Sequence, residues 1–100
     1  MTKDYRGRAR LLHQAIRRAL LIEWDPIGVG QMPEAQDEYD SYVPQIYKML
    51  ITERPKHEIF EFLWWLETEH IGLSGDRQAT EAFAERLMRI PGEIERTGSN

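Results

Sequence analysis

The residues whose types could support chemistry concentrate between Trp24 and Pro44, in the segment WDPIGVGQMPEAQDEYDSYVP. Oxygen ligands from carboxylates bind Mg²⁺ or Ca²⁺ when a folded loop brings them together. A divalent-metal site in this acidic loop is therefore one hypothesis, although the spacing does not match the pattern of calcium-binding loops. Residues 23–40 contain six carboxylates and no basic residue: Glu23, Asp25, Glu34, Asp37, Glu38 and Asp40.

The same segment has the composition of a protein-binding loop. Tyrosine provides a large contact area with little loss of rotamer entropy, and clustered carboxylates speed the encounter with a basic partner. We therefore expect a protein–protein interaction through this loop, shaped by Pro26, Gly28 and Gly30. The residues predicted to bind the partner are Trp24, Asp25, Asp37, Glu38, Tyr39, Asp40 and Tyr42.

The expected partner is either a foreign protein or a second copy of the chain. An immunity or inhibitor protein for a basic toxin nuclease is one alternative, by analogy of surface with acidic, tyrosine-rich immunity proteins. Trp24 is expected to pin the loop to the helices through a buried ring. The prediction requires an exposed acidic face, so it fails if the carboxylates contact the arginines of the first helix or if both tyrosine rings are buried.

A basic stripe on the first helix suggests nucleic-acid binding as a further alternative. Residues 1–18 carry a net charge of +5, whereas residues 19–100 carry −9. The acidic remainder would repel a phosphate backbone on a broad approach, so nucleic acid is the less favoured partner. The stripe falls on one side of a helical wheel and consists of Lys3, Arg6, Arg10, His13 and Arg17.

Signals for catalysis are weak. The chain has no cysteine, and its serines lack the glycine elbow of a nucleophile. Glu67 and His70 have the Glu-x-x-His spacing of di-metal bundles, but such sites need a second copy of the motif. We expect His70 at the end of an apolar stripe, and we predict no catalytic residues, no metal ligands in that motif and no cofactor.

Four amphipathic helices are predicted around the loop. Apolar residues recur at steps of three and four over residues 4–23, 44–51, 55–71 and 76–90, and no segment alternates as a strand does. Pro91 and Gly92 are expected to end the last helix and leave 91–100 as a loose tail. Trp65 lies off the apolar stripes beside glutamates and is expected at the rim, where it could anchor a partner. The fold class is thus all-α, a compact four-helix domain with a long structured loop between helices one and two.

Length and composition place limits on the class of protein. One hundred residues, 41% of them apolar, predict a single domain with a packed core. The absence of cysteine, of a long apolar run and of a signal-peptide stretch predicts a cytoplasmic protein with no membrane partner.

Two motifs carry a resemblance to a known family. The WDPIG element at residues 24–28 and the DEYD element at residues 37–40, followed by Ile71-Gly72-Leu73, resemble the YugE-like family of small all-helical bacterial proteins of unknown function. The resemblance covers about residues 10–75. It implies a compact helical fold and an intracellular bacterial protein, and it implies no activity.

Overall fold

Four α-helices carry most of the described chain. In the computed structural model the described residues are 5–25, 28, 32 and 37–97. Helix α1 spans Tyr5–Arg18, α2 spans Val43–Ile51, α3 spans Lys56–Trp65 and α4 spans Arg77–Thr97. These ranges contain no strand, so the predicted all-α class is confirmed.

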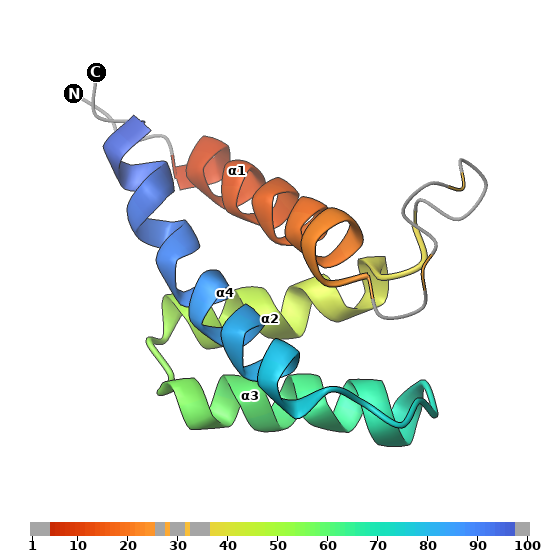
Figure 1. Cartoon of the computed structure of the whole chain (residues 1–100). Coiled ribbons are helices and arrows are strands. Elements are labelled where there is room, and N and C mark those ends of the chain that lie inside the picture. Colours follow the sequence, from red (N-terminus) through yellow and green to blue (C-terminus); the bar gives the residue numbers. More distant parts are fainter. Residues whose placement is uncertain (1–4, 26–27, 29–31, 33–36, 98–100) are drawn as a thin grey trace.

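Helix α4 is the element on which the other three pack. Figure 1 shows α4 crossing the molecule, with α1 and α3 on opposite sides of it, and α4 contacts α1, α2 and α3. The core between them contains the completely buried side chains of Ile16, Ile46, Ile59 and Leu87, one from each helix. Because each helix turns its apolar stripe inward, burial of these stripes holds the four helices together.

Two of the helices end in a wider, π-helical turn. After α1 the segment Ala19–Trp24 is π-helical, and after α3 the segment Leu66–His70 is π-helical. The N–H of Asp25 donates to the carbonyl of Leu20 at 2.8 Å, and the N–H of Ile71 donates to that of Leu66 at 2.8 Å. Each bond spans five residues, so each segment places side chains in directions that an α-helix would not.

A tight turn joins α2 to α3. Thr52 caps the end of α2 through its hydroxyl, which donates to the carbonyl of Lys48 at 2.8 Å. Glu53 then adopts a left-handed conformation with φ of 55°, at a position where helices usually place glycine. Pro55 precedes the first residue of α3 in an extended conformation, which suits a residue just outside a helix.

The connection from α3 to α4 is held by a buried carboxylate. Glu67 is only 7% exposed and accepts a hydrogen bond from the Thr80 hydroxyl and one from the backbone N–H of Asp76. Asp76 caps α4 by accepting from the N–H of Ala79 at 3.2 Å. Gly72 and Gly75 lie between them with φ of 93° and 86°.

Helix α4 continues beyond Pro91, which corrects the predicted end at residue 90 and the loose tail. Proline and glycine within a helix cost about 3 and 1 kcal/mol relative to alanine. Contacts made after Pro91 offset this, because Ile94 packs on the core and Glu93 pairs with Arg86 at 3.1 Å. The helix therefore reaches Thr97, and residues 98–100 lie outside the described ranges.

Candidate functional site

A hydrogen bond between the side chains of Asp25 and Tyr39 connects the two ends of the acidic loop. The Tyr39 side chain is 1% exposed, and its hydroxyl donates to Asp25 Oδ1 at 2.8 Å. The same oxygen accepts the N–H of Gly28 at 3.1 Å, and Gly28 has the positive φ of 83° that its type permits. This corrects the expectation that the Tyr39 ring faces a partner, because the ring belongs to the core.

Asp40 is paired within the chain. Arg17 Nε donates to Asp40 Oδ1 at 2.6 Å, so one carboxylate of the acidic loop meets the basic stripe of α1. This is one of the two arrangements that the sequence prediction named as evidence against an exposed acidic face. Both side chains remain over two-fifths exposed, so the pair adds little to stability, but it neutralises part of both predicted surfaces.

Trp24 is half-buried and is held by ring contacts. Its indole stacks on Phe83 of α4, with centroids 5.5 Å apart and planes 3° from parallel. The Tyr39 ring lies 6.3 Å from it. Trp24 therefore packs the end of the first helix on α4, with a ring that is half-buried where the sequence prediction expected a buried one.

Tyr42, Asp37 and Glu38 are the predicted contact residues that stay accessible. Asp37 and Glu38 are exposed, and neither pairs with a basic side chain within the described part of the chain. Tyr42 is half-buried. Burial of its phenol, and then the negative charge of Glu38, raise the pKa of Tyr42 above its ordinary value. Tyr42 and Glu38 therefore share one region of the surface.

The π-helical turn after α3 joins Tyr42 to a second group of rings. His70 stacks on Trp65 with centroids 5.3 Å apart, and its edge meets the Tyr42 ring at 5.8 Å. Five residues separate Trp65 from His70, a spacing that places side chains on different sides of an α-helix but on one side of the wider π turn. Phe62 stacks on Trp65 from the preceding turn, at 6.4 Å.

These rings form a surface with an acidic border. Trp65 is 49% exposed and His70 is exposed, whereas Phe62 and Tyr42 are half-buried and pack against the core. Glu61 and Glu69 lie four residues to either side of Trp65, so their carboxylates flank its ring. We call this surface the acidic aromatic patch, made of the rings of Tyr42, Phe62, Trp65 and His70 and the carboxylates of Glu38, Glu61 and Glu69.

Glu67 and His70 do not face one another as metal ligands. His70 is exposed and stacks on Trp65, which corrects its expected place at the end of the core stripe, and Glu67 is buried against Thr80. No group of three possible ligands gathers anywhere in the ranges that the structure describes. Asp25 and Asp40, central to the metal hypothesis, are bound to Tyr39 and Arg17 instead.

The basic stripe of α1 is partly occupied by contacts inside the molecule. Arg10 is exposed, but the His13 ring lies 4.2 Å from that of Tyr47 on α2, and Arg17 pairs with Asp40. Lys3 is outside the described residues, and for Arg6 only the backbone is described. Pro26, Gly30 and Glu34 of the acidic loop are likewise outside them.

Sequence reasoning placed Trp65 at the rim but did not include it, or His70, among the site residues. The available signal was an aromatic residue off the apolar stripes with glutamates around it. The contact with His70 had no signal, because a helical wheel drawn at 100° per residue separates the two. Only the π-helical turn brings them together.

Comparisons with known proteins do not identify a family for the chain. The chain matches no family model, no curated protein and no solved structure, so the resemblance to the YugE-like family stays a prediction. Within the described ranges, none of the helices has the length and apolar character that crossing a membrane requires.

Proposed function

We propose that this protein is a protein–protein interaction module that binds a positively charged segment of a partner through the acidic aromatic patch. The observation that carries the proposal is the ring of Trp65, which is 49% exposed although Phe62 and His70 hold it in place. A large ring that is rigid before binding loses little freedom when a partner covers it. Trp is also the residue type most enriched among strong interface contacts.

The physical properties of the patch favour a basic partner. Covering the exposed half of Trp65 removes about 100 Å² of mostly apolar surface from water, equivalent to about 2–3 kcal/mol of binding free energy. The carboxylates of Glu38, Glu61 and Glu69 would attract cationic side chains and speed association. The face of an aromatic ring also attracts a cation directly.

The opposite side of α3 holds an internal example of this contact. Phe60 and Trp64 stack with centroids 5.8 Å apart, and the guanidinium of Arg77 lies 4.8 Å from the Phe60 ring and 5.8 Å from that of Trp64. Phe62 and Trp65 form a comparable stacked pair. In the part of the chain that the structure describes, no cation lies over that second pair. We infer that an arginine of the partner covers it.

Binding of a fluorescein-labelled nona-arginine peptide tests the proposal by fluorescence anisotropy. We expect the wild-type protein to bind the peptide at low salt and Trp65→Ala to weaken binding about tenfold or more, as the area above implies. The matched control is Leu11→Ala, which removes an equally exposed apolar side chain, 49% exposed, from α1. Its affinity should equal that of the wild-type protein.

Changing the carboxylates separates the patch from general acidity. The triple variant Glu38→Gln, Glu61→Gln and Glu69→Gln should lose affinity and most of its salt dependence. The double variant Glu81→Gln and Glu85→Gln, on α4, is the control, because it also removes negative charge from the surface. Its effect on affinity is scaled, since it removes two charges rather than three. The proposal is wrong if the wild-type protein does not bind the peptide, or if Trp65→Ala and Leu11→Ala bind it equally well.

This proposal has two forms, both expected from the sequence. In one the chain inhibits a basic nuclease, and in the other it associates with a second copy of itself. Sedimentation at low and high salt separates them. A dimer that dissociates in salt indicates that the basic face of a second copy covers the patch. A monomer under both conditions favours a foreign basic protein, and the pairing of Arg17 with Asp40 inside one chain also favours it.

A further inference from the structure

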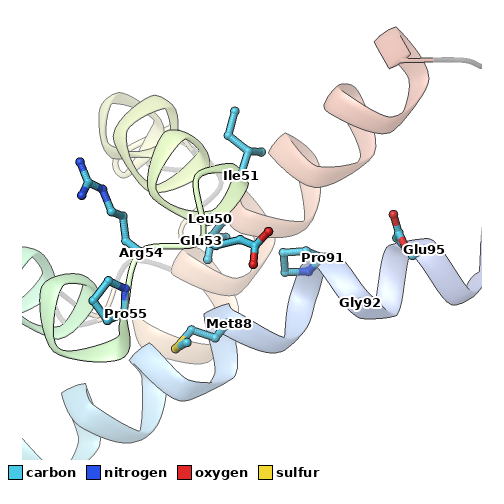
Figure 2. A pocket seen from close by; sticks show the side chains of 9 residues that line it. All are labelled: Leu50, Ile51, Glu53, Arg54, Pro55, Met88, Pro91, Gly92 and Glu95. Atoms are coloured by element: carbon cyan, nitrogen blue, oxygen red, sulfur yellow. The ribbon is translucent and has the colours of Figure 1, made fainter.

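A groove lies between the α2–α3 turn and the second half of α4. Its volume is about 600 Å³, and Figure 2 shows Leu50, Pro55, Met88 and Pro91 around it. Ile51 and Met88 are 53% and 42% exposed, so apolar side chains of the groove are open to water. The remaining lining residues are Glu53, Arg54, Gly92 and Glu95. The groove is distant from the acidic aromatic patch, since it lies at the start of α3 and the patch at its end.

Three lining residues are of types that disfavour the local backbone. Glu53 occupies a left-handed conformation, φ 55°, that glycine adopts more readily. Pro91 and Gly92 lie inside α4, where alanine would form a more stable helix. Conflicts between residue type and local structure are expected where function, rather than stability, selects the residue.

Packing within the chain does not explain Gly92. A Cβ atom added at this position would meet no atom within 4 Å. Alanine, and larger side chains, could therefore project into the open space beside the helix. The absence of a side chain at Gly92 keeps the groove open, which matters only if something enters it.

The charges around the groove indicate the chemistry of its occupant. Arg54 pairs with Glu58, and its side chain points away from the groove in Figure 2. Glu95 pairs with Arg8. Glu53 has no ion pair within the described residues, and its carboxylate extends over the groove toward Pro91. An apolar floor beneath an unpaired carboxylate suits an apolar ligand that carries a positive charge.

We propose that this groove is a second binding site, which takes an amphipathic, lysine-bearing helix of a partner protein. Leucine-type side chains of that helix contact Met88 and Ile51, and a lysine pairs with Glu53. The site does not depend on the acidic aromatic patch, because the two share no residue.

Methyl NMR with an amphipathic leucine–lysine peptide about four turns long tests the proposal. In protein labelled at the methionine methyl groups, the peptide should shift the resonance of Met88. Met32, 46% exposed and outside the groove, and Met49, 8% exposed, provide internal controls that should not shift. A peptide with glutamate in place of lysine should leave Met88 unshifted.

Two variants connect the shift to the groove. Gly92→Leu fills the open space and should weaken peptide binding about tenfold or more, and Glu53→Gln should weaken it about threefold. Gly92→Ala should raise the urea midpoint of the protein, because alanine favours the helix more than glycine does. The same variant should still weaken peptide binding, because the added methyl group occupies part of the groove. Trp65→Ala should leave the Met88 shift intact, so failure of the patch and failure of the groove are distinguishable.

The proposal is overturned if Met88 does not shift, if the glutamate peptide shifts it equally, or if both Gly92→Leu and Glu53→Gln bind like the wild-type protein. The binding result for Gly92→Leu counts only if the thermal melt of that variant is cooperative and matches the wild-type melt, which shows that the variant is folded. Glu53→Gln supplies the result if that variant does not fold.

Discussion

Replacing Tyr39 by phenylalanine tests whether the acidic loop is tied to the core. The change removes one hydroxyl that donates to Asp25 Oδ1 at 2.8 Å and leaves the buried ring in place. Hydrogen bonds to charged groups contribute about 1.5–3 kcal/mol, because the loss leaves a carboxylate short of one donor. We therefore expect Tyr39→Phe to lower the free energy of unfolding by about 2 kcal/mol, and Tm by about 10 °C.

Urea denaturation followed by circular dichroism measures this difference. Tyr42→Phe is the matched control, since its hydroxyl has no hydrogen-bond partner among the described residues and its ring is half-buried. We expect that variant within about 0.5 kcal/mol of the wild-type protein. Asp25→Asn completes a double-mutant cycle with Tyr39→Phe, and asparagine tolerates the φ of 37° at that position.

The cycle also defines the result that would refute the reasoning. If the hydroxyl and the carboxylate act together, the double variant should be less destabilised than the sum of the two single changes. Additive effects, or a Tyr39→Phe protein as stable as Tyr42→Phe, would mean that Tyr39 does not tie the loop through Asp25.

Two further predictions concern the glycines after α3 and the charge beside Tyr42. Gly75→Ala should destabilise the protein by about 1–3 kcal/mol more than Gly72→Ala. Both residues have positive φ, but only at Gly75 would a Cβ approach the ring of Trp64, at 2.8 Å, whereas at Gly72 it meets nothing within 4 Å. Thermal melts of both variants provide the comparison, and equal losses would contradict it. Glu38→Gln should lower the pKa of Tyr42 by removing the second cause of its elevation, measured from the tyrosine ring-carbon resonances as pH rises; an unchanged pKa would place Glu38 away from the patch.

Helix-forming segments were predictable because their signal is local and repeated. Ile16, Ile46, Ile59 and Leu87 each lie on an apolar stripe with helical spacing, and each is completely buried. The end of the first helix was also predictable, since Asp25 precedes a proline. The helix reaches Trp24, one residue beyond its predicted end.

Contacts between distant residues were not predictable from local patterns. The rule that proline ends a helix failed at Pro91 because the next turn packs Ile94 on the core and pairs Glu95 with Arg8 of α1. The Arg8–Glu95 pair joins residues 87 positions apart in the sequence, and local propensity contains no information about such contacts.

The candidate site shows the same limit. Charge and residue type correctly drew attention to the acidic loop, but they could not reveal that Tyr39 turns inward or that Arg17 reaches Asp40. Which side chains of the loop are accessible depends on how α1 and α2 pack, and composition does not reveal that packing. Two of the four rings of the patch, Phe62 and Trp65, lie in α3, which the sequence prediction treated mainly as scaffold.

The π-helical turn after α3 determines how the patch would respond to a change in chain length. A π turn holds one more residue than an α turn, so deleting a residue between Trp65 and His70 would let the segment relax to ordinary α-helix. The imidazole would then follow the indole by four residues, and residues four apart lie on the same face of an α-helix, so the two rings would stay close. The π turn therefore lets the chain carry one extra residue in this stretch without separating the indole from the imidazole.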